Sequence, residues 1–194
     1  MRLIISVADD QTSIQQLYHV DVGFGPNNPI RPLPLSGEPV PAGNPDLDSH
    51  RVLHAPSPLS SQNISTEQDW HVQYRPAPDT EWQTKYVFLA VEFYPQDYVV
   101  MAHAVNTLPG PRALFQNNVF MSQLFKVPEA GEDVYGRWTL FGKELKRTVV
   151  GQDDILKEFG LEEARVNAIQ ETFGIHITED ELECIRGRQS ALSM

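Results

Sequence analysis

An acidic side chain stands within a run of residues that otherwise has the composition of a buried strand. In LYHVDVGFGP, residues 17–26, Asp21 lies among Val20, Val22 and Phe24, and β-branched and aromatic residues suit a half-buried strand. The glycines and proline that follow predict the end of that strand. An ionised carboxylate in such a setting is costly unless something pairs with it. Asp21 is therefore either a strand-end aspartate that accepts hydrogen bonds from a turn, or a buried carboxylate that orients a histidine.

Three other side chains have the chemistry of metal ligands or nucleophiles. His50 and His54 are four residues apart in HRVLH, but this segment has the composition of a strand. Four residues along a strand span roughly 13 Å, too far for two ligands of one ion, so we expect no metal. Cys184 is the only cysteine, which excludes an intrachain disulfide, and no histidine lies near it in the sequence. We expect it to be a buried structural cysteine.

The composition restricts the classes of partner. A chain of 194 residues with 41% apolar and 21% charged residues is sufficient for one domain with a core, or for two small lobes. The formal charge of −11 argues against a nucleic-acid partner, because binding the phosphate backbone needs a basic face. No apolar run reaches the length of a membrane span, and the N-terminal residues lack a signal-peptide pattern. We therefore expect no membrane partner and a cytoplasmic location.

Strand patterns dominate the first 150 residues. A proline-rich loop at 26–49 precedes three short β-rich runs, HRVLHA, WHVQYRP and WQTKYVFLAVEFY, whose spacing is typical of an antiparallel barrel or sandwich. The run QDYVVMAHAVN predicts a short helix, and ALFQNNVFMSQLFKV predicts a long strand. The segment GRWTLFGKELKRTVVG predicts a hairpin that turns near Gly142 and Lys143.

Beyond Gly151 the apolar residues recur at helical intervals, which predicts two or three closing helices. The last of these begins at TEDE, where Thr178 is placed to cap the helix and Glu181 to reach back to it. The predicted fold is mixed α+β, with an antiparallel β-barrel domain at residues 1–150 and a C-terminal helical segment at residues 151–194.

Several of these segments resemble the arylamine N-acetyltransferases, and the likeness is to a fungal-type member. The run YHVDVGFGPNNPIRPLPL is similar to the V-D-V/A-G-F-G strand of that family, in which the aspartate is catalytic. The downstream runs WQTKYVFLAVEFYPQDYVVM and NTLPGPRALF resemble its W…Y-x-F…E-F-x-x-x-D-F-x-x-M and T-S-P-x-S-x-F segments. The hairpin and the closing helices resemble its final barrel strands and third domain, which implies that residues 1–150 include the start of the family's lid.

The resemblance implies a function and roles for individual residues. In the family, acetyl-CoA is the co-substrate, and the acetyl group passes through a cysteine to the nitrogen of a small arylamine or hydrazine. A histidine activates the cysteine, and the aspartate holds the histidine. Asp21 corresponds to that aspartate, and Phe24 to the aromatic position that lines the acceptor pocket. Thr107 and Phe115 correspond to positions near the coenzyme, while Leu108 and Ala113 replace two serines of the family segment.

Two family elements are not found in this sequence. It contains no R-G-G-x-C, and MRLIISV matches the strand that carries the family histidine but starts after that residue. His19 lies on the same strand face as Asp21, but no thiol is available for it to activate. We expect a truncated and inactive form, which exposes an apolar barrel surface and self-associates through it. Two alternatives stay open: a non-catalytic barrel module that binds a partner or small ligand, and a truncated gene model.

Overall fold

The computed structural model describes residues 2–8, 15–21, 28–44, 47–57, 68–107, 114–149 and 152–193. It divides into two compact units. The first consists of residues 1–91 and 126–135, and the second of residues 92–125 and 136–194. Within the described residues, no helix combines the length and the apolar character that a membrane crossing requires.

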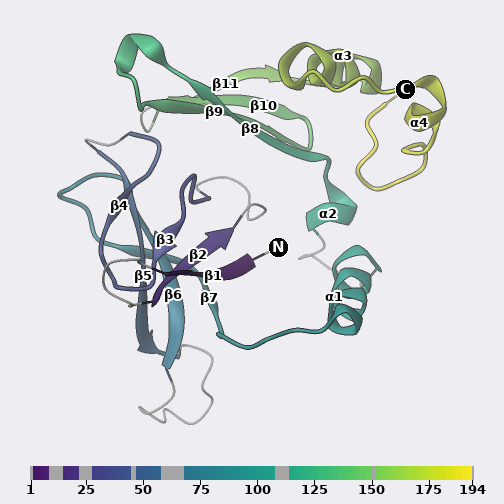
Figure 1. The fold of residues 1–194 in the computed structure, drawn as a ribbon. Helices are drawn as coiled ribbons and strands as arrows, with labels where there is room; N and C mark the ends of the chain where they lie inside the picture. The colour runs from purple at the N-terminus through teal and green to yellow at the C-terminus, as the bar shows by residue number, and fades with distance from the viewer. Residues whose placement is uncertain are drawn as a thin grey trace. The chain divides into compact units, whose positions relative to one another are not determined.

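The first unit contains two open antiparallel sheets (Figure 1). A three-stranded sheet has the order β1-β2-β3, formed by β1 (Arg2–Ala8), β2 (Gln15–Asp21) and β3 (Leu33–Pro34). A four-stranded sheet has the order β4-β5-β6-β7, formed by β4 (Val40–Pro41), β5 (Ser49–Pro56), β6 (Gln68–Arg75) and β7 (Gln83–Phe88). A short 3-10 turn, η1 (Pro128–Ala130), also belongs to this unit.

The core of the first unit joins its two sheets. Leu33 of β3, Val52 of β5 and Val72 of β6 are buried and form one cluster, which excludes their apolar surface from water. The proline-rich segment contributes to this core through β3 and is tied to β5 where the Gly37 N–H donates to the Val52 carbonyl at 2.9 Å. Gly37 has φ +84°, a left-handed conformation that glycine adopts without strain.

The second unit contains a sheet with the order β11-β10-β9-β8, with helices before and after it. Two helices come first, α1 (Pro95–Thr107) and α2 (Leu114–Asn117). The strands are β8 (Phe120–Lys126), β9 (Tyr135–Phe141), β10 (Glu144–Val149) and β11 (Gln152–Glu158). The helices α3 (Glu162–Phe173) and α4 (Glu179–Glu183) follow.

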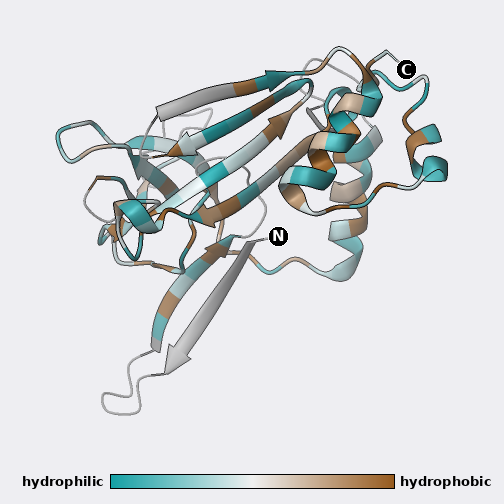
Figure 2. Cartoon of the chain, turned by 90° about the horizontal axis from the view of Figure 1, so that it is seen from above, coloured by the Kyte–Doolittle hydropathy of each residue, from teal (hydrophilic) through white to brown (hydrophobic). Residues whose placement is uncertain are grey.

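Helix α3 packs on this sheet. Its buried residues Ala168 and Ile169 form one apolar cluster with Leu140 of β9, Leu145 of β10 and Phe159. Leu140 and Leu145 are direct cross-strand partners, so they point to the same face of the sheet. Figure 2 shows hydrophobic and hydrophilic residues alternating along these strands, the pattern of a sheet with one buried face.

Several sequence predictions are confirmed. The β-rich runs predicted at residues 50–55, 70–76 and 82–94 form the strands β5, β6 and β7, although β7 ends at Phe88. The helix α1 and the β9–β10 hairpin also form. The hairpin turns at Gly142, which has φ +58°. Thr178 and Glu181 form the predicted reciprocal cap at the start of α4.

Other predictions need correction. The mixed α+β class is confirmed, but the described strands form three open sheets and no closed barrel is found among them. Residues 152–158 form strand β11 instead of the start of a helix. The apolar pattern of so short a segment fits a strand as well as a helix, and pairing with β10 favours the strand. The strand predicted over residues 113–127 is also shorter, since residues 114–117 form α2.

Candidate functional site

Asp21 is the last residue of β2, and its side chain is only 5% exposed. The Tyr86 hydroxyl donates a hydrogen bond to the Asp21 carboxylate oxygen Oδ2 at 2.6 Å. The backbone carbonyl of the same residue accepts a hydrogen bond from Asn28 Nδ2 at 2.7 Å. The prediction that this carboxylate is buried is therefore confirmed.

His19 completes the cluster around Asp21. It lies two residues earlier on β2, and side chains two apart on a strand point to the same face. The ring is 0% exposed, and its Nε2 is 2.9 Å from the Tyr86 hydroxyl oxygen. It also stacks on Phe88, with ring centroids 4.6 Å apart and planes 20° from parallel.

The fold brings these side chains together from separate strands. β2 is the middle strand of its sheet, with Asp21 opposite Arg2 on β1 and His19 opposite both Ile4 and Leu33. Tyr86 lies on β7, where it pairs with Val72 of β6. Tyr86 and Phe88 both pack against the buried cluster that contains Val72. The packing of the two sheets thus places the Tyr86 hydroxyl against Asp21.

This arrangement suits a carboxylate that orients another group. A 2.6 Å hydrogen bond falls in the range of about 2.5–2.7 Å that is typical of a hydroxyl bound to an ionised oxygen. Burial strengthens electrostatic interactions with any partner of the carboxylate. An aspartate held in this way can fix the tautomer and orientation of an imidazole and stabilise its protonated form. The sequence interpretation considered His19 only as a replacement base and did not find Tyr86.

The remaining predicted site residues have different outcomes. Phe24 lies outside the described residues. Thr107 is the last residue of α1 and is exposed, and its hydroxyl donates to the His103 carbonyl of the same helix at 2.6 Å. Phe115 lies in α2, but its side chain is outside the described set. The coenzyme roles of Thr107 and Phe115 stay predictions.

The histidines and the cysteine discussed above lie in ordinary structural settings. His50 and His54 contact the rings of Tyr74 and Trp70, with centroids 5.0 Å and 4.0 Å apart. Among the side chains that the structure describes, no group of three His, Cys, Asp or Glu is placed to hold a metal ion. The prediction of a buried Cys184 is wrong: the thiol is exposed at the end of α4 and donates to the Asp180 carbonyl at 3.4 Å. None of the five residues of α4 is buried, and Cys184, which caps the end of this helix, is exposed with them.

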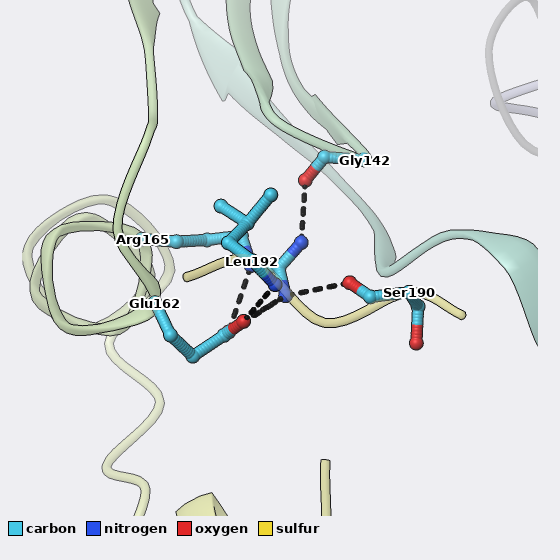
Figure 3. A network of polar contacts seen from close by, with 5 residues as sticks. All are labelled: Gly142, Glu162, Arg165, Ser190 and Leu192. Carbon is cyan, nitrogen blue, oxygen red and sulfur yellow. Dashed lines mark hydrogen bonds and ion pairs between the residues drawn. The ribbon is translucent and has the colours of Figure 1, made fainter. Parts of the chain in front are cut away.

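The second unit contains another buried carboxylate, which the sequence interpretation did not find. Glu162 and Arg165, at the start of α3, are 3% and 0% exposed and form a hydrogen-bonded ion pair at 2.6 Å (Figure 3). Arg165 also donates to the carbonyls of Gly142 and Ser190, at 2.8 Å and 2.9 Å. Glu162 accepts from the Leu192 N–H at 2.9 Å. The pair therefore connects α3 by hydrogen bonds to the β9–β10 turn and to the C-terminal residues.

The fold is similar to that of solved arylamine N-acetyltransferases. The chain superposes on the arylamine N-acetyltransferase from Salmonella typhimurium, with a TM-score of 0.65, 19% identity, and coverage of 94% of this chain and 59% of that one. For the Mycobacterium smegmatis enzyme, the TM-score is 0.63 and the identity 20%, and the match covers 97% of this chain and 64% of that one. For the Mycobacterium marinum enzyme solved in complex with CoA, the TM-score is 0.58 and the identity 22%, and the match covers 94% of this chain and 66% of that one. These similarities establish an arylamine N-acetyltransferase type of fold.

The sequence comparisons agree with this class. Residues 3–182 match the family model described as N-acetyltransferase. The chain belongs to the arylamine N-acetyltransferase family of acyltransferases. It is also 32% identical over 169 residues to the N-malonyltransferase FDB2 of Fusarium pseudograminearum, and 29% identical over 171 residues to that of Gibberella moniliformis. In both cases the match covers 84% of this chain and 48% of the relative, so the chain spans about half the length of these curated relatives.

Proposed function

We propose that this chain supplies the carboxylate of a Cys-His-Asp acyl-transfer site that moves an acyl group from a coenzyme A thioester to an arylamine or hydrazine nitrogen. The observation that carries the proposal is Asp21, a carboxylate 5% exposed whose Oδ2 accepts from the Tyr86 hydroxyl. It occupies the family's aspartate position in a chain that belongs to the family. In such a site the aspartate acts through the histidine.

The proposed reaction has two steps. The imidazole takes the proton of the cysteine thiol, and the thiolate attacks the thioester carbonyl of acyl-CoA; a new C–S bond forms, the bond to the coenzyme sulfur breaks, and the imidazolium returns the proton to coenzyme A, which leaves as the thiol. The amine nitrogen then attacks the acyl-cysteine; the N–C bond forms, the C–S bond breaks, and the imidazole takes the proton from the nitrogen. Asp21 stabilises the imidazolium in both steps. The cysteine and histidine come from polypeptide outside these 194 residues, whose sequence contains no R-G-G-x-C.

The acyl donor is acetyl-CoA or malonyl-CoA. The family resemblance favours acetyl-CoA, and the Mycobacterium marinum enzyme has been solved in complex with CoA. The relatives from Fusarium pseudograminearum and Gibberella moniliformis are named N-malonyltransferases. A malonyl group adds a carboxylate, which needs hydrogen-bonding partners of its own in the site. Activity with acetyl-CoA and with malonyl-CoA can therefore be compared by experiment. Thr107 and Phe115 are the residues that we propose near the coenzyme.

A chimera tests this proposal. The chain replaces the matching stretch of the Fusarium pseudograminearum relative, and acyl transfer to an arylamine is measured by mass spectrometry with acetyl-CoA and malonyl-CoA in parallel. We expect transfer by the chimera, and a loss of kcat of about 10⁴-fold in its Asp21→Asn variant. Asp79→Asn, the same change at an exposed turn residue, serves as the matched control. Full activity of Asp21→Asn would overturn the proposal, whereas a folded but inactive chimera would favour the non-catalytic module.

The 194-residue chain alone is expected to transfer no acyl group. Its one thiol, Cys184, is exposed and bonded to the carbonyl of Asp180. Incubation with either donor and an arylamine should therefore give product no faster than buffer does, and should leave Cys184 unmodified. Turnover by the isolated chain would show that the site is elsewhere.

We further propose that the chain self-associates through exposed apolar side chains. Many large apolar side chains between Leu89 and Val105 are exposed, and Val99 and Val100 on α1 are about 70% exposed. The sequence analysis expected the exposed apolar surface on the strands of a barrel, whereas these residues lie outside the strands. Light scattering should show an oligomer that Val100→Lys weakens and Asn106→Lys, on the same helix, does not. A monomer at all concentrations would exclude self-association.

A further inference from the structure

The hydrogen bonds around Asp21 form a chain of three side chains from two strands. His19 Nε2 lies 2.9 Å from the Tyr86 hydroxyl oxygen, and that oxygen lies 2.6 Å from Asp21 Oδ2. His19 and Asp21 come from β2, and Tyr86 comes from β7. The hydroxyl therefore stands between an imidazole nitrogen and a carboxylate oxygen.

Counting protons assigns the direction of both bonds. A tyrosine hydroxyl has one hydrogen to donate. Tyr86 donates that hydrogen to Asp21 Oδ2, so toward His19 its oxygen acts as the acceptor. It follows that His19 carries a hydrogen on Nε2, because a bare Nε2 would place two lone pairs against each other.

We propose that His19 is a positioning residue: it donates its Nε2 hydrogen to Tyr86 and thereby keeps the Tyr86 hydroxyl directed at Asp21. The surroundings of the ring support this role. His19 is 0% exposed, is stacked on Phe88, and belongs to the middle strand of its sheet. A ring confined in this way cannot turn its nitrogen away from Tyr86 without disturbing the packing.

The consequence for the site is a carboxylate whose orientation is set in advance. With the Tyr86 hydroxyl fixed on Oδ2, the plane of the Asp21 carboxylate is fixed as well. An aspartate that orients a catalytic histidine is effective only when it holds that ring in one tautomer and position. The role of Asp21 in this inference rests on the proposed function, but the hydrogen bonds of His19 do not.

The tautomer of His19 in the isolated chain is the direct test. Nitrogen-15 NMR distinguishes a hydrogen on Nε2 from a hydrogen on Nδ1, and needs neither an acyl donor nor activity. We expect a hydrogen on Nε2 at pH 7.5, in slow exchange with water, and loss of this slowly exchanging signal in Tyr86→Phe. A hydrogen on Nδ1 with a bare Nε2 in the native chain would overturn the proposal.

A conservative pair of variants separates positioning from packing. His19→Gln keeps an N–H donor near the position of Nε2, whereas His19→Leu keeps the apolar volume and removes the donor. We expect the Tyr86 hydroxyl proton to stay in slow exchange in His19→Gln and to be lost from the spectrum in His19→Leu. Equal retention in both variants would reduce His19 to a packing role. Because no transfer is measured, inactivity of the chimera would count against the proposed function alone.

Discussion

The two units each bury a carboxylate in a different way. Glu162, in the second unit, faces a fully buried guanidinium, which also binds two backbone carbonyls. Asp21, in the first unit, accepts from the neutral hydroxyl of Tyr86. The Arg165 guanidinium cancels the charge of Glu162, whereas the Tyr86 hydroxyl supplies a dipole directed at the Asp21 carboxylate.

This difference separates a structural carboxylate from one suited to chemistry. The Glu162 pair connects α3, the β9–β10 turn and the C-terminal residues, so its hydrogen bonds are used in holding the fold. The Tyr86 hydroxyl holds the Asp21 carboxylate in position through a directed hydrogen bond. In the proposed reaction a positive charge forms on the imidazole during transfer, and stabilising that charge is the contribution of an aspartate in such a site.

The largest expected effect comes from breaking the pair in the second unit. Arg165→Met leaves Glu162 buried without its guanidinium, which should lower the free energy of unfolding by about 3–5 kcal/mol. Chemical denaturation followed by circular dichroism measures this loss. The double variant Arg165→Met with Glu162→Gln removes the uncompensated charge and should recover part of the stability. A loss below about 1 kcal/mol in the single variant, the value typical of exposed pairs, would contradict the structural role.

A smaller effect is expected in the first unit. Tyr86→Phe removes the hydroxyl that donates to Asp21 and should lower the free energy of unfolding by about 1–3 kcal/mol, because a buried acceptor loses a hydrogen bond. Tyr18→Phe is the matched control, since its hydroxyl donates to Gln16 at an exposed site at 2.9 Å. That control should change stability by less than about 0.5 kcal/mol. Equal losses in the two variants would remove the distinction between the Tyr86–Asp21 bond and an exposed one.

The smallest effect is local and depends on pH. Glu181 is exposed, and hydrogen bonds from the Thr178 backbone and side chain lower its pKa from the ordinary value of 4.5. Because the folded pKa is the lower one, the stabilisation of α4 is complete above about pH 4.5 and is lost as the pH falls through the folded pKa. Amide hydrogen exchange of Leu182, which bonds to the Thr178 carbonyl, should report this loss.

Two variants check the assignment to Glu181. Glu181→Gln should remove the pH dependence of exchange at Leu182, since its side chain does not titrate. Glu179→Gln, in the same first turn but outside the cap, should keep it. Persistence of the pH dependence in Glu181→Gln would mean that another group controls the end of α4.

The sequence by itself determined most of the local helices, strands and turns, and it drew attention to Asp21. The β-rich runs predicted β5, β6 and, in the first part of the run at 82–94, β7. Glycine predicted the turn at Gly142, and Thr178 with Glu181 predicted a helix cap. These features depend on residues close in the chain, where propensity and side-chain spacing act directly. The apolar strand around Asp21 left two interpretations open, a strand-end aspartate or a buried carboxylate, and the family resemblance decided between them.

Only the tertiary structure decided which groups these residues meet. Tyr86 lies 65 residues after Asp21, and Arg165 reaches carbonyls 23 and 25 residues away. The periodicity of a strand or helix fixes the face on which a side chain lies, but not the partner that packs against that face. The strand β11 is a similar case, since its pairing with β10 overrode a pattern that fitted a helix. Hydrogen bonds are short and directional, so their partners are chosen only when packing brings distant segments to within a few ångströms.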